Sequence, residues 1–276
     1  MKDFIERAAV SSQTPPGKTG PGFRRFSHLS GCPDLAHAVF DRTGGVSTPP
    51  FDSLNVGFST GDDPDAVMEN RSRILSFLGL SRALFVNQVH GSDMLVLPAA
   101  KADPHLFWKP GLPAPATCIT ADGMVTDLPD LALVIQVADC QAVLLADPVK
   151  KVVANVHSGW RGSLENIIGK CVDVMTGRFT CRPEDILAGI SPSLGPCCAE
   201  FKHFRTEIPQ HLWQYKHPHK DYFDFWALSR DQLLEKNLHP DHVKNMCLCT
   251  QCRPDRFFSF RNAGRTGRFA CAIGIC

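Results

Sequence analysis

A cysteine and a histidine, each at the end of an apolar run, are the residues with the clearest chemical potential. Cys140 closely follows residues 132–137 (ALVIQV), and His157 ends residues 152–157 (VVANVH). A thiolate and an imidazole could hold zinc, could act as nucleophile and base, or could both be buried packing residues. An isolated pair of this kind is more often structural than catalytic, so the neighbouring sequence has to decide.

The residues after His157 favour an active site. Residues 158–162 (SGWRG) form a Gly-rich turn that contains Arg161, and apolar residues at helical spacing follow until Gly177. Exposed amides at a helix N-terminus, together with an arginine, make a site for an anion such as phosphate. A packed core would not need such a site.

Strand and turn patterns predict the elements that position these residues. Residues 132–137, 142–146 and 152–157 are typical of strands, and the turn at 147–150 joins the last two in a hairpin. Other strands are predicted at 37–40, 84–86, 94–97, 186–190 and 269–275, and helices at about 64–78, 164–177 and 223–238. Cys140 and His157 therefore fall at neighbouring strand ends.

Length and charge limit the classes of protein. A chain of 276 residues can bury a sizeable core, and we expect a single catalytic domain over residues 25–276 after a flexible tail over residues 1–24. The net charge of +1 offers no bulk field for nucleic acid or for an anionic membrane. Because no apolar run is long enough to cross a membrane and no signal-peptide core is present, a cytoplasmic location is predicted.

The twelve cysteines are expected to be thiols or metal ligands, with most of them packing residues. Cys197 and Cys198 are adjacent, and adjacent cysteines rarely chelate one metal, so both are predicted to pack. Cys249 and Cys252 form only half of a structural zinc motif, and the sequence offers no matching second pair. They are predicted to be thiols in a turn.

Several stretches taken together resemble one bacterial family. They are NQVHG, ADGMVTDLPDLALVIQVADC, VHSGWRG, GPCC, and a closing CTQC with FFSFR and TGR. The family has long been called laccase-like polyphenol oxidoreductases and more recently purine nucleoside phosphorylases. The likeness covers roughly residues 36–275, with the motifs in the family's order. It implies a single α+β domain with mixed β-sheets flanked by helices, similar to bacterial toxin deamidases that carry a Cys-His pair.

The resemblance implies a metal site at His90, Cys140 and His157, three ligands that leave one tetrahedral position open. That is the pattern of catalytic zinc, although copper is also possible with two histidines and a cysteine. Cys140 and His157 would thus be catalytic as well as metal-binding.

Arginines and polar side chains complete the implied site. Arg42 and Arg161 are assigned to catalysis through phosphate or ribose contacts, and Asn55, Gln88 and Arg261 are expected to bind substrate. Two carboxylates are further candidates as proton donors, with hydrogen bonding in turns as their alternative role: Asp122 and Asp139.

The resemblance implies a zinc-dependent purine nucleoside phosphorylase that also deaminates adenosine. Its partners would be phosphate and nucleosides such as adenosine, inosine and methylthioadenosine, with no nucleic acid and no membrane. Two alternatives stay open. One is a copper-dependent polyphenol oxidase, and the other is a metal-free hydrolase with Cys140 as nucleophile and His157 as base.

Overall fold

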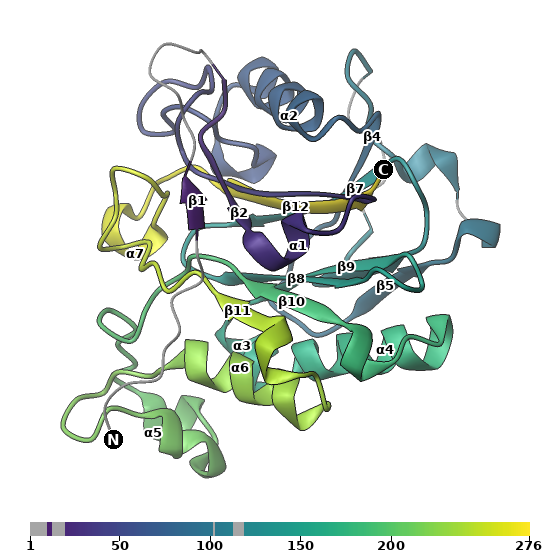
Figure 1. The fold of residues 1–276 in the computed structure, drawn as a ribbon. Helices are drawn as coiled ribbons and strands as arrows, with labels where there is room; N and C mark the ends of the chain where they lie inside the picture. The colour runs from purple at the N-terminus through teal and green to yellow at the C-terminus, as the bar shows by residue number, and fades with distance from the viewer. Residues whose placement is uncertain (1–9, 13–19, 102, 113–118) are drawn as a thin grey trace.

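The computed structural model describes residues 10–12, 20–101, 103–112 and 119–276 and folds them into two stacked β-sheets with helices on the outer faces (Figure 1). The first sheet has the order β1 (Val10–Ser12), β2 (Phe23–Phe26), β3 (Leu35–Phe40), β12 (Phe269–Ile275), β7 (Leu131–Val137) and β4 (Arg82–Phe85). The second has the order β11 (Val243–Asn245), β10 (Leu187–Ile190), β8 (Gln141–Asp147), β9 (Val152–Ser158), β6 (Gly123–Thr126) and β5 (Met94–Leu97).

Both sheets are mixed. The pairs β4–β7, β5–β6 and β10–β11 are parallel, and the other paired strands are antiparallel. Side chains alternate along each strand, so β7 turns Leu133 and Ile135 into the core between the sheets and Val134 toward the outside. Because helices cover the outer faces as well, β7 is apolar at every position except Gln136.

The longer helices form the outer layers, whereas α1 lies between the two sheets with Leu29 in their shared core (Figure 1). Helix α2 packs on the first sheet and contributes Ile74 and Leu75 to its outer core, whereas α4 packs on the second with Ile168 and Val172 (Figure 1). The helices are α1 (Ser27–Ser30), α2 (Pro64–Leu78), α3 (Trp160–Leu164), α4 (Ile167–Phe179), α5 (Phe204–Glu207), α6 (Phe225–Glu235) and α7 (Phe260–Ala263).

The predicted hairpin is confirmed and sets the position of the candidate residues. Strands β8 and β9 pair antiparallel with Gln141 opposite Ser158 and Ala142 opposite His157. This register brings Cys140, one residue before β8, level with the residues that follow β9. The two candidate residues therefore meet at one end of the second sheet.

The segment after His157 differs from the prediction of one helix entered through a loop. Helix α3 already begins at Trp160, and Asn166, with φ of 54°, separates it from α4. The Asn166 side chain accepts a hydrogen bond from the amide of Gly169 at 2.9 Å and so starts a new helix. Arg161 consequently lies within a five-residue helix rather than in an open turn.

The predicted tail over residues 1–24 is only partly described, since residues 1–9 and 13–19 lie outside the described residues. Within the described part, β1 pairs antiparallel with β2, and Phe23 and Arg24 of β2 also belong to the predicted tail. The free edge of β2 offers backbone groups that a short extended segment can satisfy with little apolar surface. β1 and the start of β2 therefore lie in the segment predicted as a tail, and the domain boundary at residue 25 stays a prediction.

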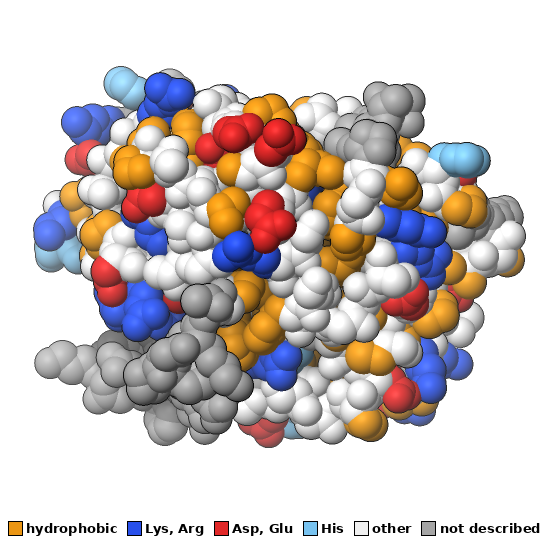
Figure 2. Space-filling view, turned by 90° about the horizontal axis from the view of Figure 1, so that it is seen from above, with side chains coloured by type: hydrophobic (Ala, Val, Ile, Leu, Met, Phe, Trp, Pro, Cys, Tyr) orange, Lys and Arg blue, Asp and Glu red, His pale blue; other side chains and the backbone are white. Residues whose placement is uncertain are grey.

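Charged side chains are interspersed on the face that carries α2. Figure 2 shows Lys and Arg beside Asp and Glu across this face, with apolar side chains between them. This mixture agrees with the net charge of +1. Within the described residues, no helix combines the length and the apolar character that a membrane crossing requires.

Candidate functional site

His90, Cys140 and His157 come together as predicted. Their ligand atoms lie within 4.8 Å of one another. His90 belongs to the turn between β4 and β5, Cys140 to the turn between β7 and β8, and His157 to the end of β9. The two imidazole rings meet edge to face with centroids 4.8 Å apart. Three separate strand ends therefore supply one group of ligands.

The backbone around this group is held in uncommon conformations. His90 has φ of 62° and Asp139, next to Cys140, has φ of 90°. Such backbone conformations cost free energy and persist only where the surrounding structure holds them, and they are common at functional sites. Gly159 allows the close approach, since a Cβ there would lie 2.8 Å from the His90 ring and 3.3 Å from the Cys140 sulfur. A larger residue at 159 would push the ligands apart.

Asp122 orients the group from behind. It is fully buried, and its Oδ1 lies 2.7 Å from Nδ1 of His157. The same carboxylate accepts hydrogen bonds from the amides of His90 at 3.0 Å and Gly91 at 2.7 Å. Burial alone would raise the pKa of Asp122, but His157 and these amides lower it overall. A carboxylate behind a histidine fixes which ring nitrogen is left for a metal. In this structure Asp122 therefore holds the His157 ring and the turn at His90 and Gly91 in place.

The thiol and the imidazole are electrostatically coupled. Burial opposes ionisation of Cys140, yet the neighbouring His157 and His90 lower its pKa to about 6. Burial likewise opposes the charged form of His157, but Cys140 and Asp122 raise its pKa to about 9. Both shifts favour a thiolate on Cys140 and an imidazolium on His157.

The donor set fits a catalytic metal. One sulfur and two imidazoles suit zinc, and three protein ligands leave a position for a substrate or water. The lowered pKa of Cys140 favours the thiolate that a metal requires. Asp122 keeps Nδ1 of His157 engaged, as in many carboxylate–histidine–zinc sites. Zinc and copper share these ligand types, so the geometry supports a metal without deciding its identity.

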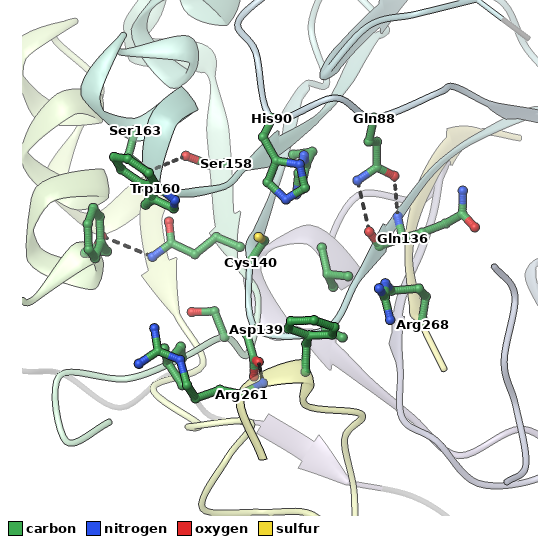
Figure 3. A pocket seen from close by; sticks show the side chains of 18 of the residues that line it. Gln88, His90, Gln136, Asp139, Cys140, Ser158, Trp160, Ser163, Arg261 and Arg268 are labelled. Atoms are coloured by element: carbon green, nitrogen blue, oxygen red, sulfur yellow. Dashed lines mark hydrogen bonds between the residues drawn. The ribbon is translucent and has the colours of Figure 1, made fainter. Parts of the chain in front are cut away.

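The ligands open into a cavity of about 490 Å³. His90 and Cys140 lie on one side of it, and Asp139, Arg261 and Arg268 lie on the other sides (Figure 3). Aromatic side chains supply much of the remaining wall: Trp160, Phe201, Phe225 and Phe260. The cavity therefore joins soft metal ligands, cations and flat apolar surfaces.

Two of the predicted substrate-binding residues line this cavity. The Gln88 amide pairs with the backbone of Gln136, donating to its oxygen and accepting from its nitrogen, both at 2.9 Å. Arg261 donates its backbone amide to the Asp139 carboxylate at 2.6 Å and its guanidinium to the Glu200 carbonyl at 3.1 Å. Gln88 thus shapes the wall, and Arg261 presents a cation at the edge.

Three predicted residues do not line the cavity. Arg42 forms an ion pair with Asp52 at 3.1 Å and borders a separate small hollow. Arg161 is exposed on α3, with its guanidinium over the ring of Trp160. Asn55 is fully buried and bonds Gly57, Thr60, Asp62 and Arg268. Arg42 and Asn55 thus stabilise loops, whereas Arg161 stacks on its neighbour within α3, and the loop-like sequence around them could not reveal these contacts.

Arg268 is the residue that the sequence reasoning missed. It lines the cavity, and its Nη1 donates to the carbonyls of Thr266 and Gly267, both at 3.0 Å. Burial lowers the pKa of Arg268, so this guanidinium is desolvated. The signal available in the sequence was the closing TGR motif, in which the arginine received no role.

A second group of thiols brings together the two pairs that the sequence treated apart. Cys197 is exposed rather than packed, whereas Cys252 lies in a turn as predicted. Cys197, Cys198, Cys249 and Cys252 bring their sulfurs within 4.8 Å of one another. The predicted packing and turn roles treated the two pairs separately. The fold joins them because Ser193 and Cys249 form a parallel bridge that aligns the two segments.

Comparisons with known proteins agree with the motifs. The family model described as "Multi-copper polyphenol oxidoreductase laccase" matches residues 36–276. Purine nucleoside phosphorylase YlmD of Geobacillus stearothermophilus is 33% identical over 88% of this chain and 92% of its own length. Purine nucleoside phosphorylase YfiH of Shigella flexneri is 32% identical over 85% of this chain and 91% of its own.

Solved structures show the same fold. The crystal structure of YlmD from Geobacillus stearothermophilus matches with a TM-score of 0.82 and 28% identity, covering 96% of this chain and 99% of that one. A Bacillus licheniformis protein named YfiH gives 0.81 and 27%, covering 93% and 97%. These likenesses confirm the predicted α+β domain, whereas the expected similarity to toxin deamidases stays a prediction. The chain belongs to the family described as Multi-copper polyphenol oxidoreductase laccase.

Proposed function

We propose that this chain is a zinc-dependent purine nucleoside phosphorylase, which transfers the sugar of a purine nucleoside to phosphate and releases the base. The relatives named purine nucleoside phosphorylase support an enzyme of this kind. The observation that carries the proposal is the single cavity shared by His90, Cys140, His157 and Arg268 (Figure 3). Phosphorolysis requires an anion and a base to be held together, and this cavity has groups for both.

Each wall of the cavity has a role in this reaction. The aromatic residues offer faces for the purine, and stacking of a base on such a ring contributes about 1–3 kcal/mol. Arg268 lies in a partly buried setting in which a charge-assisted hydrogen bond to phosphate is strengthened. Among the described residues Arg268 forms no salt bridge, so its charge is available to an anion.

The three ligands are the proposed zinc site. A bound zinc ion would supply a Lewis acid that polarises an oxygen atom. Asp122 and the amide bonds around it hold His157 and His90 in place before any substrate enters. Arg268 and Arg261 would hold the anion, while Arg42 and Arg161, which do not line the cavity, take no direct part in this scheme.

Adenosine deamination is proposed as a second reaction of the same cavity. It requires a group that moves a proton at the base, and Asp139 is the one carboxylate among the described residues that line the cavity. Its oxygens already accept hydrogen bonds from Thr250 and Arg261, both at 2.6 Å. Asp139→Asn should therefore reduce inosine formation from adenosine more than it reduces adenine formation.

Product analysis tests the proposal. Adenosine is incubated with the zinc-loaded enzyme, with and without phosphate, and the products are separated by chromatography. Adenine and ribose 1-phosphate in equal amounts, formed only with phosphate, are expected. Arg268→Gln should raise the KM for phosphate about 10-fold or more, since hydrogen bonds to charged groups contribute about 1.5–3 kcal/mol. Arg178→Gln, an exposed arginine on α4, is the matched control. An unchanged phosphate KM in Arg268→Gln would remove that residue from the anion site.

A metal-free thiol hydrolase is the second candidate, because Cys140, His157 and Asp122 also form a nucleophile–base–carboxylate series. His90, which also bonds the Cys140 sulfur, has no place in such a series but is explained by a metal. The alternatives separate by metal removal. A hydrolase keeps its activity after chelation, a phosphorylase loses it, and a copper oxidase oxidises phenols only when loaded with copper.

A further inference from the structure

The second thiol group has the composition of a structural metal site. It contains four sulfurs and no other ligand type, and the Sγ atoms of Cys197, Cys198, Cys249 and Cys252 all lie within 4.8 Å of one another. Four thiolates are a standard ligand set for structural zinc. None of these four residues lines the cavity that contains His90, Cys140 and His157. The group is therefore separate from the proposed active site.

The sulfur separations match metal coordination better than a disulfide. The Sγ of Cys252 lies 3.6 Å from that of Cys197 and 3.5 Å from that of Cys198. A disulfide requires about 2.05 Å. In a tetrahedral site with Zn–S bonds of about 2.3 Å, two sulfurs lie about 3.8 Å apart. The same Cys252 sulfur is near two partners at once, which a disulfide cannot satisfy but a shared metal can.

Local backbone structure explains how adjacent cysteines can face the same point. An extended pair would direct its side chains to opposite faces. Residues 196–198 instead form a turn, closed by bonds from the amides of Cys198 and Ala199 to the Gly195 carbonyl, both at 2.9 Å. The turn rotates successive side chains by less than the half-turn of a strand, so both thiols can reach Cys252.

A backbone donor also points at the group. The Gly195 amide lies 3.4 Å from the Sγ of Cys249. A Cβ at Gly195 would lie 2.8 Å from the ring of Trp226, so a side chain there would disturb this approach. Amide-to-sulfur bonds of this kind favour a thiolate.

We propose that Cys197, Cys198, Cys249 and Cys252 bind one structural Zn²⁺ ion, which fastens the turn at 195–198 to the turn at 249–252. Each thiol that coordinates the ion gives up its proton to solvent, and no oxidant or reductant takes part. Two of the cysteines, Cys197 and Cys252, are exposed, so the ion can enter from solvent without unfolding the core.

The two turns joined by the ion contact Asp139, the residue directly before Cys140. Thr250, within the second turn, donates its hydroxyl to the Asp139 carboxylate at 2.6 Å. Leu194, next to the first turn, donates its amide to the Asp139 carbonyl at 2.8 Å. Asp139 is the positive-φ residue directly before Cys140. A metal between the turns would therefore stabilise the uncommon conformation that presents Cys140 to the cavity, whichever reaction occurs there.

Metal content of the purified full-length chain tests this site independently of catalysis. After loading with Zn²⁺ alone and removal of excess ion, we expect two equivalents in the wild type, counted as one for each group of ligands. Cys252→Ser should lose one equivalent and keep the active-site metal. Cys140→Ser should lose the other one. Cys276→Ser, an exposed thiol outside both groups, is the matched control and should keep both.

A spectroscopic measurement protects the test against misfolded variants. Cys140→Ser protein loaded with Co²⁺ should show the sulfur-to-cobalt charge-transfer and intense visible bands of a tetrahedral four-thiolate site. Cys198→Ala in the same background should lose them while its circular dichroism is retained. Zinc content that is unchanged by Cys252→Ser would overturn the site, and so would a zinc-free wild type in which Cys252 forms a disulfide with Cys197 or Cys198 on purification without added reductant. Neither outcome depends on nucleoside phosphorolysis.

Discussion

The two thiol-containing groups of this protein differ in ligand number, ligand type and setting. His90, Cys140 and His157 combine two imidazoles with one sulfur at the wall of a cavity, whereas the second group has four sulfurs and lies outside the cavity lining. Three ligands leave a position for a reacting molecule, and four fill a tetrahedron. The difference indicates that the first group suits a catalytic metal site and the second a structural one.

The two groups are connected although they share no ligand. Asp139 lies between them, bonded through its carboxylate to Thr250 of the second turn and joined by the chain to Cys140. Asp122 plays the corresponding part behind His157. Each ligand of the first group is thus held by residues that do not themselves face a metal. Variants of ligands and of supporting residues should therefore have effects of different size.

The largest effect is expected from a ligand of the first group. Cys140→Ser should lower nucleoside phosphorolysis by at least about 100-fold, since even the partners behind metal ligands are worth about 10–100-fold. Its metal content should fall by one equivalent, with the second group unaffected. Steady-state kinetics and metal analysis of the same preparation give both values. If Cys140→Ser retained full activity, the first group of ligands would not be the catalytic one.

A smaller effect is expected behind the ligands. Asp122→Asn keeps the shape but weakens the acceptor for His157, so zinc affinity at the first group should fall by about 10–100-fold. Competition with a chromophoric chelator measures that affinity. Asp65→Asn, on the exposed first turn of α2, is the matched control. If Asp122→Asn binds zinc as tightly as the wild type, the carboxylate does not orient His157 for a metal.

The supporting contact between the groups should give a still smaller effect. Thr250→Val removes the hydroxyl that donates to Asp139, a bond of about 1 kcal/mol, so kcat/KM should fall about 5-fold. Zinc content should stay at the wild-type value. Thr206→Val, whose hydroxyl bonds only within its own exposed helix region, should leave kcat/KM unchanged. If Thr250→Val had wild-type kinetics, the contact between Thr250 and Asp139 would not link the second group to the activity of the first.

The first group could be predicted from the sequence because each ligand lies in a recognisable motif beside a strand end. The apolar runs at 132–137 and 152–157 place Cys140 and His157, and the motif match adds His90. The role of Asp122 could not be read in the same way. Its contact with His157 spans 35 positions and depends on the pairing of β6 with β9.

The second group shows what local spacing leaves out. Cys197 and Cys198 are separated from Cys252 by more than fifty positions. The parallel pairing of β10 with β11 and the bridge between Ser193 and Cys249 align the two turns. The arginines illustrate the opposite case. Arg42 and Arg161 have the residue type that binds phosphate, yet an ion pair and a stacking contact engage them outside the cavity. Residue type predicts chemistry, but long-range pairing decides its location.

The smallest expected effect is a difference between the two groups in the number of protons released when zinc binds. At pH 7.5 the pKa of Cys140, about 6, leaves it a thiolate, and the pKa of His157, about 9, leaves it protonated. Zinc therefore displaces about one proton from this pair. In the second group burial raises the pKa of Cys197 to about 11 and also raises that of Cys198, so both must lose protons on binding.

We therefore expect about twice as many protons per zinc, or more, at the second group as from the Cys140–His157 pair at the first. Cys252→Ser protein retains only the first group and Cys140→Ser protein only the second. Titration calorimetry of each, in two buffers of different ionisation enthalpy, gives the number of protons released. A rise in pH should strengthen zinc binding more steeply at the second group, because more thiol protons compete with the ion there. Equal proton counts in the two variants would show that the thiols of both groups are in the same protonation state before the metal arrives.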